Sequence, residues 1–106
     1  MYAKWTFLSN HAHVLALLCN EPDLRMRDIA DRVRITERAV QRIIHDLVEE
    51  SYLTVGKEGR RNRYDINFDA HLRHPLEAGV TIRQFLEGLG SLGSVDRDAA
   101  KSTDAS

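Results

Sequence analysis

The stretch MRDIADRVRITERAVQRIIHDLV, residues 26–48, decides the fold of this chain. Apolar residues recur in it at helical spacing in two runs, of which the first contains Ile29, Ala30 and Val33. The second run is longer and contains Val40, Ile43, Ile44, Leu47 and Val48. Each run places its apolar side chains on one stripe, and such a stripe has to be buried. The pattern therefore predicts two short helices that are joined by a tight turn and share one core.

Polar residues mark the start and the outer face of the second helix. Thr36 is a good N-cap because its hydroxyl can accept a backbone N–H that lacks a helical partner, so the helix is predicted over residues 37–50. Arg and Gln side chains pair with guanine and adenine edges in a DNA major groove. The face opposite the apolar stripe carries such residue types at Arg38, Gln41, Arg42 and His45. The alternative is an αα-hairpin whose basic face is simply solvated.

The segment SYLTVGKEGRRNRYDINF, residues 51–68, predicts a β-hairpin. Leu53 and Val55 alternate with polar residues in the first half, and Tyr64, Ile66 and Phe68 do so in the second. The two glycines between the halves allow a turn. This connection, residues 56–63, is predicted to form a charged loop that contains Lys57, Arg60, Arg61 and Arg63. Residues 24–26 are a candidate for a short strand beside the hairpin.

From Trp5 to about Phe68 the chain resembles the winged-helix transcriptional regulators of the MarR and ArsR type. The closest matches are TERAVQRIIHDLVEESYL, residues 36–53, and GRRNRY, residues 59–64. The resemblance implies a mainly α-helical fold with a small β-hairpin, which is a winged helix-turn-helix with a three-helix core and a short C-terminal helix. Arg34 and Ser51 stand where this family usually has glycine, and a left-handed backbone costs such residues about 1–2 kcal/mol.

The same resemblance implies a sequence-specific DNA-binding transcriptional regulator, more often a repressor than an activator, whose partner is double-stranded DNA. The second helix would lie in the major groove and the hairpin, or wing, on the backbone or in the minor groove. The expected DNA-binding residues are Thr36, Arg38, Gln41, Arg42, His45, Lys57, Arg60, Arg61 and Arg63. The alternative is a winged helix that binds a protein instead of DNA, which the acidic residues Asp46, Glu49 and Glu50 leave open.

The segments outside this region predict two more helices. Ser9 precedes a helical pattern over residues 10–20, and Thr81 with Gln84 forms a capping-box sequence before a helix of about two turns. In the family, terminal segments commonly build a homodimer interface, whereas the alternative is that the last helix closes the core of its own subunit. The candidate dimerisation residues are Trp5, Phe7, Ile82, Phe85, Leu86 and Leu89.

Length and composition favour one globular domain. The chain has 106 residues, of which 1–89 are predicted to form the domain and 90–106, which lack apolar periodicity, a disordered tail. The longest apolar run, residues 14–19, is far shorter than the roughly 20 residues of a membrane helix, and the N-terminus lacks a secretory signal pattern. A cytoplasmic location is therefore expected. Cys19 lies in this apolar run and is expected to be a small core residue rather than a redox switch.

Charge supports nucleic-acid binding only when it is divided by region. The whole chain has a net charge of −1, but residues 25–63 contain ten Lys and Arg against seven Asp and Glu. Clustered charge attracts phosphates more than total charge does, because screening limits its range to about 8 Å.

His71 and His74 form an HxxH pair, but zinc needs three or four ligands, so no metal is expected. No catalytic motif is present, so neither an enzyme nor a cofactor is expected, and no effector ligand can be named.

Overall fold

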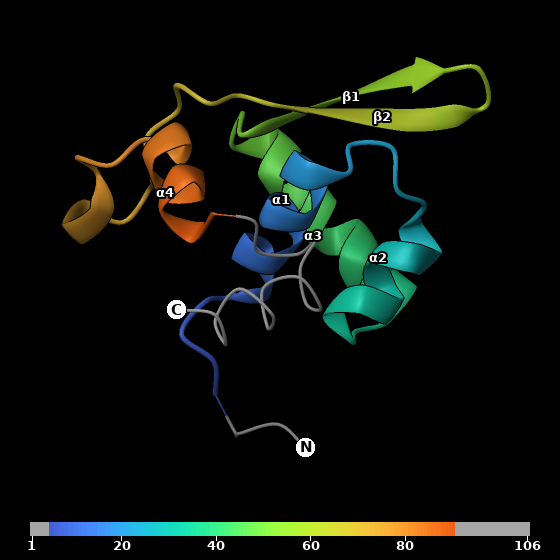
Figure 1. Cartoon of the computed structure of the whole chain (residues 1–106), viewed down its shortest axis with the longest axis horizontal. Coiled ribbons are helices and arrows are strands. Elements are labelled where there is room, and N and C mark those ends of the chain that lie inside the picture. Colours follow the sequence, from blue (N-terminus) through green and yellow to red (C-terminus); the bar gives the residue numbers. More distant parts are fainter. Residues whose placement is uncertain (1–4, 91–106) are drawn as a thin grey trace, which may run out of the picture.

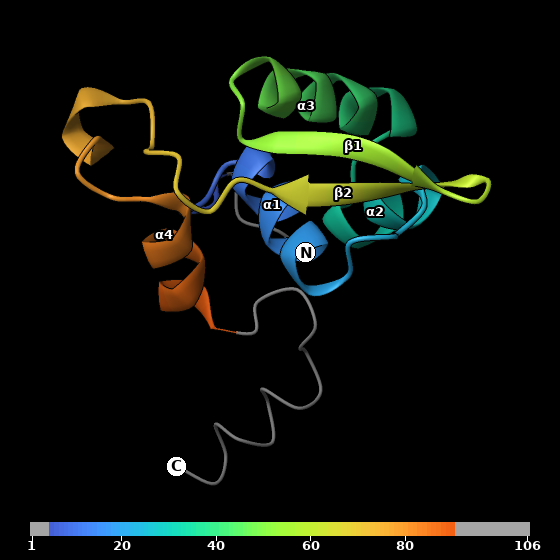
Figure 2. The ribbon, with the colours of Figure 1, turned by 90° about the horizontal axis from the view of Figure 1, so that it is seen from above.

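The computed structural model describes residues 5–90, which contain four α-helices, one short 3-10 helix and one two-stranded antiparallel sheet (Figure 1). Figure 1 shows α1, α2 and α3 at a lower level than the β1–β2 hairpin, with α4 beside its open end, and Figure 2, seen from above, shows α3 running alongside β1. In chain order the elements are α1 (Asn10–Asn20), α2 (Met26–Val33), α3 (Glu37–Glu49), β1 (Leu53–Glu58), β2 (Arg61–Ile66), η1 (Pro75–Glu77) and α4 (Ile82–Leu89).

The core lies between the first three helices and the base of the hairpin. Its largest fully buried side chains include Leu18 of α1, Ile29 of α2 and Val40 of α3, so both predicted stripes face the core, although Val33 in the first is only partly buried. Val48 is the exception in the second stripe, because it lies at the edge of the helix and is exposed. Cys19 was also expected in the core, but its side chain is exposed at the end of α1. Burial of part of this residue still raises the pKa of its thiol.

The helix starts are set by side chains that accept backbone N–H groups. The Thr36 hydroxyl accepts from the Ala39 N–H at 3.0 Å, and α3 begins at Glu37 as predicted. The Ser9 hydroxyl accepts from the Ala12 N–H at 3.2 Å at the start of α1. These bonds satisfy N–H groups that the first turn of a helix leaves without partners.

Two helices end at residues with a left-handed backbone. Arg34 after α2 has φ 68° and ψ 48°, and the Ile35 N–H behind it donates to the Ala30 carbonyl at 3.0 Å. Ser51 after α3 has φ 65°. There the Ser51 N–H donates to Val48 and the Tyr52 N–H to Leu47, which is the bonding pattern of a Schellman motif. The chain therefore adopts at both positions the conformation for which glycine is the favoured residue.

The hairpin is tighter than the predicted loop over residues 56–63. The strands pair from Leu53 with Ile66 to Glu58 with Arg61, so only Gly59 and Arg60 form the turn. Gly59 has φ 68°, while Arg60 has no positive φ, which fits a two-residue turn with glycine first. Gly56, expected in the loop, lies inside β1. The tight turn matches the twist of the strands, and it continues the ladder almost to the tip.

The expected short strand at residues 24–26 is wrong, because α2 already begins at Met26. In the described part of the chain the sheet has two strands. The preceding loop instead makes one backbone bond to the hairpin, in which the Tyr64 N–H of β2 donates to the Pro22 carbonyl at 2.9 Å. Tyr64 is buried against the core below this contact.

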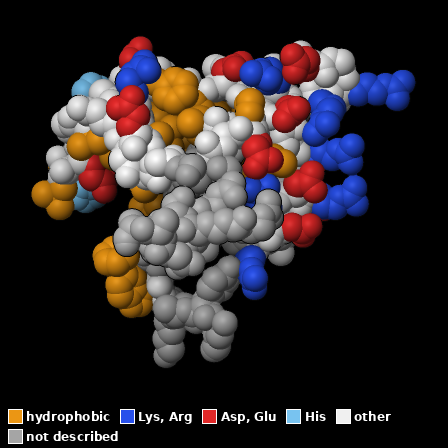
Figure 3. All heavy atoms as spheres, viewed as in Figure 1, with side chains coloured by type: hydrophobic (Ala, Val, Ile, Leu, Met, Phe, Trp, Pro, Cys, Tyr) orange, Lys and Arg blue, Asp and Glu red, His pale blue; other side chains and the backbone are white. Residues whose placement is uncertain are grey.

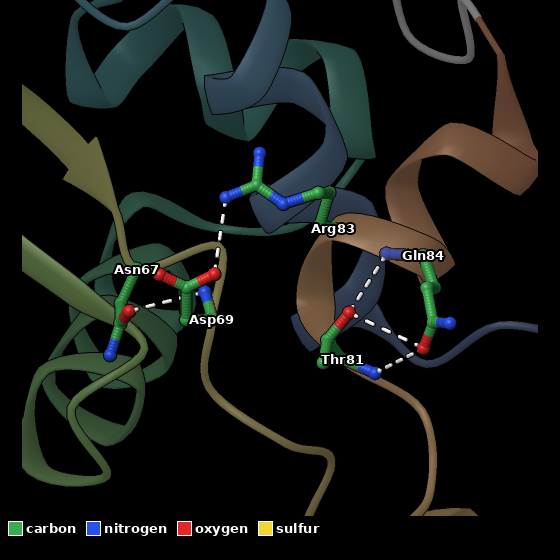
Figure 4. Close-up of polar contacts among 5 residues, drawn as sticks. All are labelled: Asn67, Asp69, Thr81, Arg83 and Gln84. Carbon is green, nitrogen blue, oxygen red and sulfur yellow. Dashed lines mark hydrogen bonds and ion pairs between the residues drawn. The ribbon is translucent and has the colours of Figure 1, made fainter.

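Helix α4 is fixed to the segment that follows β2 (Figure 4). Thr81 and Gln84 form the predicted capping box. The N–H groups of Ile82 and Arg83 donate to the carbonyls of Ala70 and Phe68 at 2.8 and 3.0 Å, so the first turn has partners for its N–H groups. The Arg83 guanidinium also binds the Asp69 carboxylate at 3.1 Å and lies over the Phe68 ring.

Helix α4 also closes the core of its own subunit. Ile82 is 1% exposed and Leu86 is 7% exposed. These two side chains therefore belong to the interior and are unavailable on the surface for a second subunit. Phe85 and Leu89 are half-buried against the same core.

Within residues 5–90, no helix combines the length and the apolar character needed to cross a bilayer. The predicted disordered tail, residues 90–106, lies almost entirely outside the described residues.

Candidate nucleic-acid interface

The solvent side of α3 carries the residue types expected to touch bases. The helix buries Val40, Ile43 and Leu47, so its opposite side is turned away from the core. Arg38, Gln41, Arg42 and His45 are all exposed on that side. Among the described residues, the side chains of Arg38 and Gln41 make no hydrogen bond or ion pair. The amphipathic pattern of α3 thus presents polar groups that are still available for an outside partner.

The second half of α3 is more constrained by acidic residues. His45 lies 4.0 Å from the Glu49 carboxylate, and both side chains are largely exposed. Asp46 is turned toward α1, where its carboxylate is 2.8 Å from His11 Nε2. The hydrogen bond with His11 lowers the pKa of Asp46 below its ordinary value. This contact joins α1 to α3 and keeps the Asp46 carboxylate turned toward α1, away from the basic face of α3.

The structure divides the four wing cations into two pairs. Arg63 is 3.6 Å from the Glu58 carboxylate and 3.9 Å from that of Asp65, so its charge is matched within the hairpin. Arg61 donates to the backbone carbonyl of Asp23 at 2.6 Å. Lys57 and Arg60 have no ion pair or side-chain hydrogen bond within the part of the chain that is described. Only these two cations remain uncommitted on the wing.

Basic side chains gather at one margin of the molecule. In Figure 3, Lys and Arg side chains project where the hairpin tip and α2 lie, with acidic side chains between them, whereas hydrophobic side chains gather in the other half. Arg25 and Arg27 at the start of α2 are exposed and were not among the predicted contacts. Their only sequence signal was the positive charge of residues 25–63, which does not distinguish individual residues.

An open cleft of about 840 Å³ lies beside the C-terminal half of α3, between α1 and the segment that leads to α4. Its walls combine aromatic side chains such as Phe7 and Phe85 with charged ones such as Glu49 and Arg73. His71 and His74 do not act as a pair, since His71 Nδ1 bonds the Ala78 carbonyl and His74 Nδ1 accepts the Leu76 N–H. Across residues 5–90, no three His, Cys, Asp or Glu side chains form a group that could hold a metal ion.

The candidate dimerisation residues separate by burial. Trp5 and Phe7 are 66% and 92% exposed, and their rings form an edge-to-face pair with centroids 5.3 Å apart. Two exposed aromatic side chains in contact make an apolar surface that the described part of the chain leaves uncovered. Ile82 and Leu86, by contrast, are buried within the subunit.

Three packed helices followed by a two-stranded hairpin define the winged helix-turn-helix class. The sequence pattern of the MarR family matches residues 6–63, which is more than half of the chain. The chain therefore belongs to the MarR family, whose members are DNA-binding transcriptional regulators. The predicted fold and family are confirmed.

Solved structures that are similar to this chain include three transcriptional regulators. The zinc-dependent MarR family transcriptional regulator AdcR, in its Zn(II)-bound state, is 25% identical with a TM-score of 0.46; the match covers 62% of this chain but only 47% of AdcR. The Streptomyces coelicolor transcriptional regulator PcaV, in complex with its natural ligand, is 21% identical with a TM-score of 0.49, covering 99% and 74%. Lactococcus lactis ZitR in complex with DNA is 17% identical with a TM-score of 0.49, covering 97% and 71%. No curated protein matches the chain significantly.

Proposed function

We propose that this protein regulates transcription by binding duplex DNA, with α3 in the major groove and the wing on the backbone or in the minor groove. The observation that carries the proposal is the exposed face of α3. Arg38 and Gln41 have no partner among the described residues, and the buried stripe fixes them on the outer side. Arg and Gln are the residue types that recognise guanine and adenine edges. The wing adds Lys57 and Arg60, which suit phosphate contact.

Base contacts and phosphate contacts should respond differently to substitution. Arg38→Ala or Arg42→Ala is expected to cost about 1–3 kcal/mol at a preferred site and to relax base preference there. Lys57→Ala or Arg60→Ala should weaken binding to all sequences alike. Removing a single phosphate-binding cation should also reduce the slope of log K against log salt by about 0.9.

The experiment begins with selection of bound sequences from random duplex DNA, because the operator is unknown. Fluorescence anisotropy then compares the parent with Arg38→Ala and Arg60→Ala on the selected and on a scrambled duplex over a salt series. Loss of discrimination only in Arg38→Ala supports the division of roles. If the parent selects no sequence and the variants bind as it does, the DNA-binding proposal is wrong. The surface of α3 would then fit the alternative of a protein-binding module.

We propose that the regulator is a two-fold dimer in which Trp5 and Phe7 contribute the contact, together with the half-buried Phe85 and Leu89. A dimer presents two recognition helices about 34 Å apart, which matches half-sites one DNA turn apart. Phe7 is 92% exposed, and the contact that Phe7→Asp removes within the chain is the edge-to-face pair with the exposed Trp5, so the fold should be kept. Sedimentation should show a folded monomer for Phe7→Asp and a dimer for Phe7→Leu. A monomeric parent at tens of micromolar would contradict the dimer.

We also propose that occupation of the operator represses transcription by blocking polymerase, which requires only a DNA-binding unit of the kind that α1, α2, α3 and the wing form. In vitro transcription from a promoter that overlaps the selected site should decrease when the protein is added. Arg38→Ala should leave transcription unchanged at the same concentration. An increase in transcript would instead indicate an activator.

A further inference from the structure

We propose that Arg61, the first residue of β2, positions the wing by bracing it on the α1–α2 loop and does not itself contact DNA. Its effect on DNA binding rests on the proposed function above, but the brace is a property of the free protein.

The outer half of the hairpin has little packing beneath it. In β1 only Leu53, at the base, is buried, and Val55 is 44% exposed. In β2 only Tyr64 is buried. An isolated two-stranded hairpin is marginally stable in water, so the tip needs contacts of another kind to keep one position.

Two hydrogen bonds from β2 provide such contacts. The Arg61 guanidinium donates to the Asp23 carbonyl at 2.6 Å, and the Tyr64 N–H donates to the carbonyl of the adjacent Pro22 at 2.9 Å. Figure 1 shows the loop between α1 and α2 directly beside the hairpin. Two contacts three residues apart fix both the distance of β2 from the α1–α2 loop and the direction of the strand. The bond from Arg61 is the outer of the two, and its charged donor makes it the stronger type.

The brace lies next to the cations that remain available. Arg60 precedes Arg61 in the chain, and Lys57 pairs with Asn62, the residue that follows it. Because these residues are neighbours in the chain or across the strand pair, the position of Arg61 also determines the positions of both side chains. Arg61 therefore fixes where Lys57 and Arg60 meet a phosphate, while its own guanidinium is engaged by the protein. Without the brace, the wing has to be ordered each time DNA binds, which lowers affinity.

Arg61→Ala and Arg60→Ala are matched variants, because each removes one exposed positive charge from the wing. The first measurement is the ¹⁵N heteronuclear NOE of the backbone amides at residues 57–62 in the free protein. We expect these NOE values to fall in Arg61→Ala and to keep the parental values in Arg60→Ala. A thermal midpoint close to that of the parent confirms that both variants fold.

The second measurement is affinity for a random-sequence duplex over a salt series. Arg60→Ala should lower the slope of log K against log salt by about 0.9. Arg61→Ala should lower affinity about threefold to tenfold, as loss of one hydrogen bond would, with the parental slope. Unchanged NOE values, or a slope reduced as much as in Arg60→Ala, would overturn the proposal. If the parent does not bind DNA, the proposed function fails, and the NOE comparison still decides the brace.

Discussion

Replacing Ser51 by glycine should stabilise the protein. Ser51 occupies the left-handed position that closes α3, with φ 65°. Its side chain is exposed and makes no hydrogen bond within residues 5–90. The contacts at this corner use its backbone, since the Ser51 N–H donates to Val48 and its carbonyl accepts from Asn67 Nδ2 at 3.1 Å. Ser51→Gly therefore removes a strained Cβ and keeps every described bond.

The expected gain is the difference between two opposing effects. A left-handed backbone costs a residue with a Cβ about 1–2 kcal/mol. Part of the gain from relieving this strain is lost, because glycine makes the unfolded chain more flexible. This opposing effect is roughly 0.4–1 kcal/mol. The free energy of unfolding should therefore rise by about 0.5–1 kcal/mol, which corresponds to an increase of about 2–8 °C in Tm for a domain of this size.

Urea unfolding followed by circular dichroism measures this change, with Ser51→Ala as the matched control. Alanine also removes the hydroxyl but keeps the Cβ, so Ser51→Ala should show no gain. If Ser51→Gly has the stability of the parent or less, the strain at this position is smaller than the geometry indicates. If Ser51→Ala gains as much as Ser51→Gly, the hydroxyl rather than the backbone was unfavourable.

Arg34→Gly, at the other left-handed position, should also raise the free energy of unfolding. The gain should be smaller than for Ser51→Gly, because the arginine side chain makes interactions that glycine cannot make. A decrease in stability in urea unfolding would contradict this. His11→Ala should raise the pKa of Asp46 toward its ordinary value in a ¹³C NMR titration of the carboxyl group. In the parent, the lowered folded-state pKa stabilises the fold above the unfolded-state pKa, and this contribution is lost as pH falls through the folded-state value. The acid loss of stability should thus be shallower in His11→Ala, and an equally steep loss would exclude this pair as its source. Thr81→Ala should cost about 1 kcal/mol by removing the cap of α4, whereas Thr81→Ser should cost little; equal losses in calorimetry would show that the hydroxyl is not what matters.

The helix starts could be predicted from the sequence because they depend on neighbouring residues. Thr36 lies one residue before α3 and caps an N–H three residues away, so the complete interaction is visible in a short segment. The same holds for Thr81 and Gln84 at α4. The buried stripes could be predicted for a similar reason, since helical periodicity alone decides which side chains share a face.

Errors occurred where the outcome depends on distant parts of the chain. The run at residues 14–19 is apolar throughout, so its pattern could not show that Cys19 is the position left outside the core. Likewise, the apolar stripe of α4 indicates that the helix must be covered but not by what. Ile82 and Leu86 are buried within the domain, where N–H groups at the start of α4 donate to the carbonyls of Ala70 and Phe68 and hold the helix in place. Those bonds have no signature in the local sequence.

The wing cations illustrate the same limit at the candidate site. In the sequence, Lys57, Arg60, Arg61 and Arg63 are equivalent positive charges in one short segment. The structure separates them through acceptors of two kinds. Arg63 meets carboxylates of its own hairpin, whereas Arg61 meets the Asp23 carbonyl, which is 38 residues away. A backbone carbonyl is present at every residue, so no composition or motif identifies the one that will accept a bond. The pair of strands has to be placed on the α1–α2 loop before the cations that the protein itself engages can be distinguished from those that stay available to an outside partner.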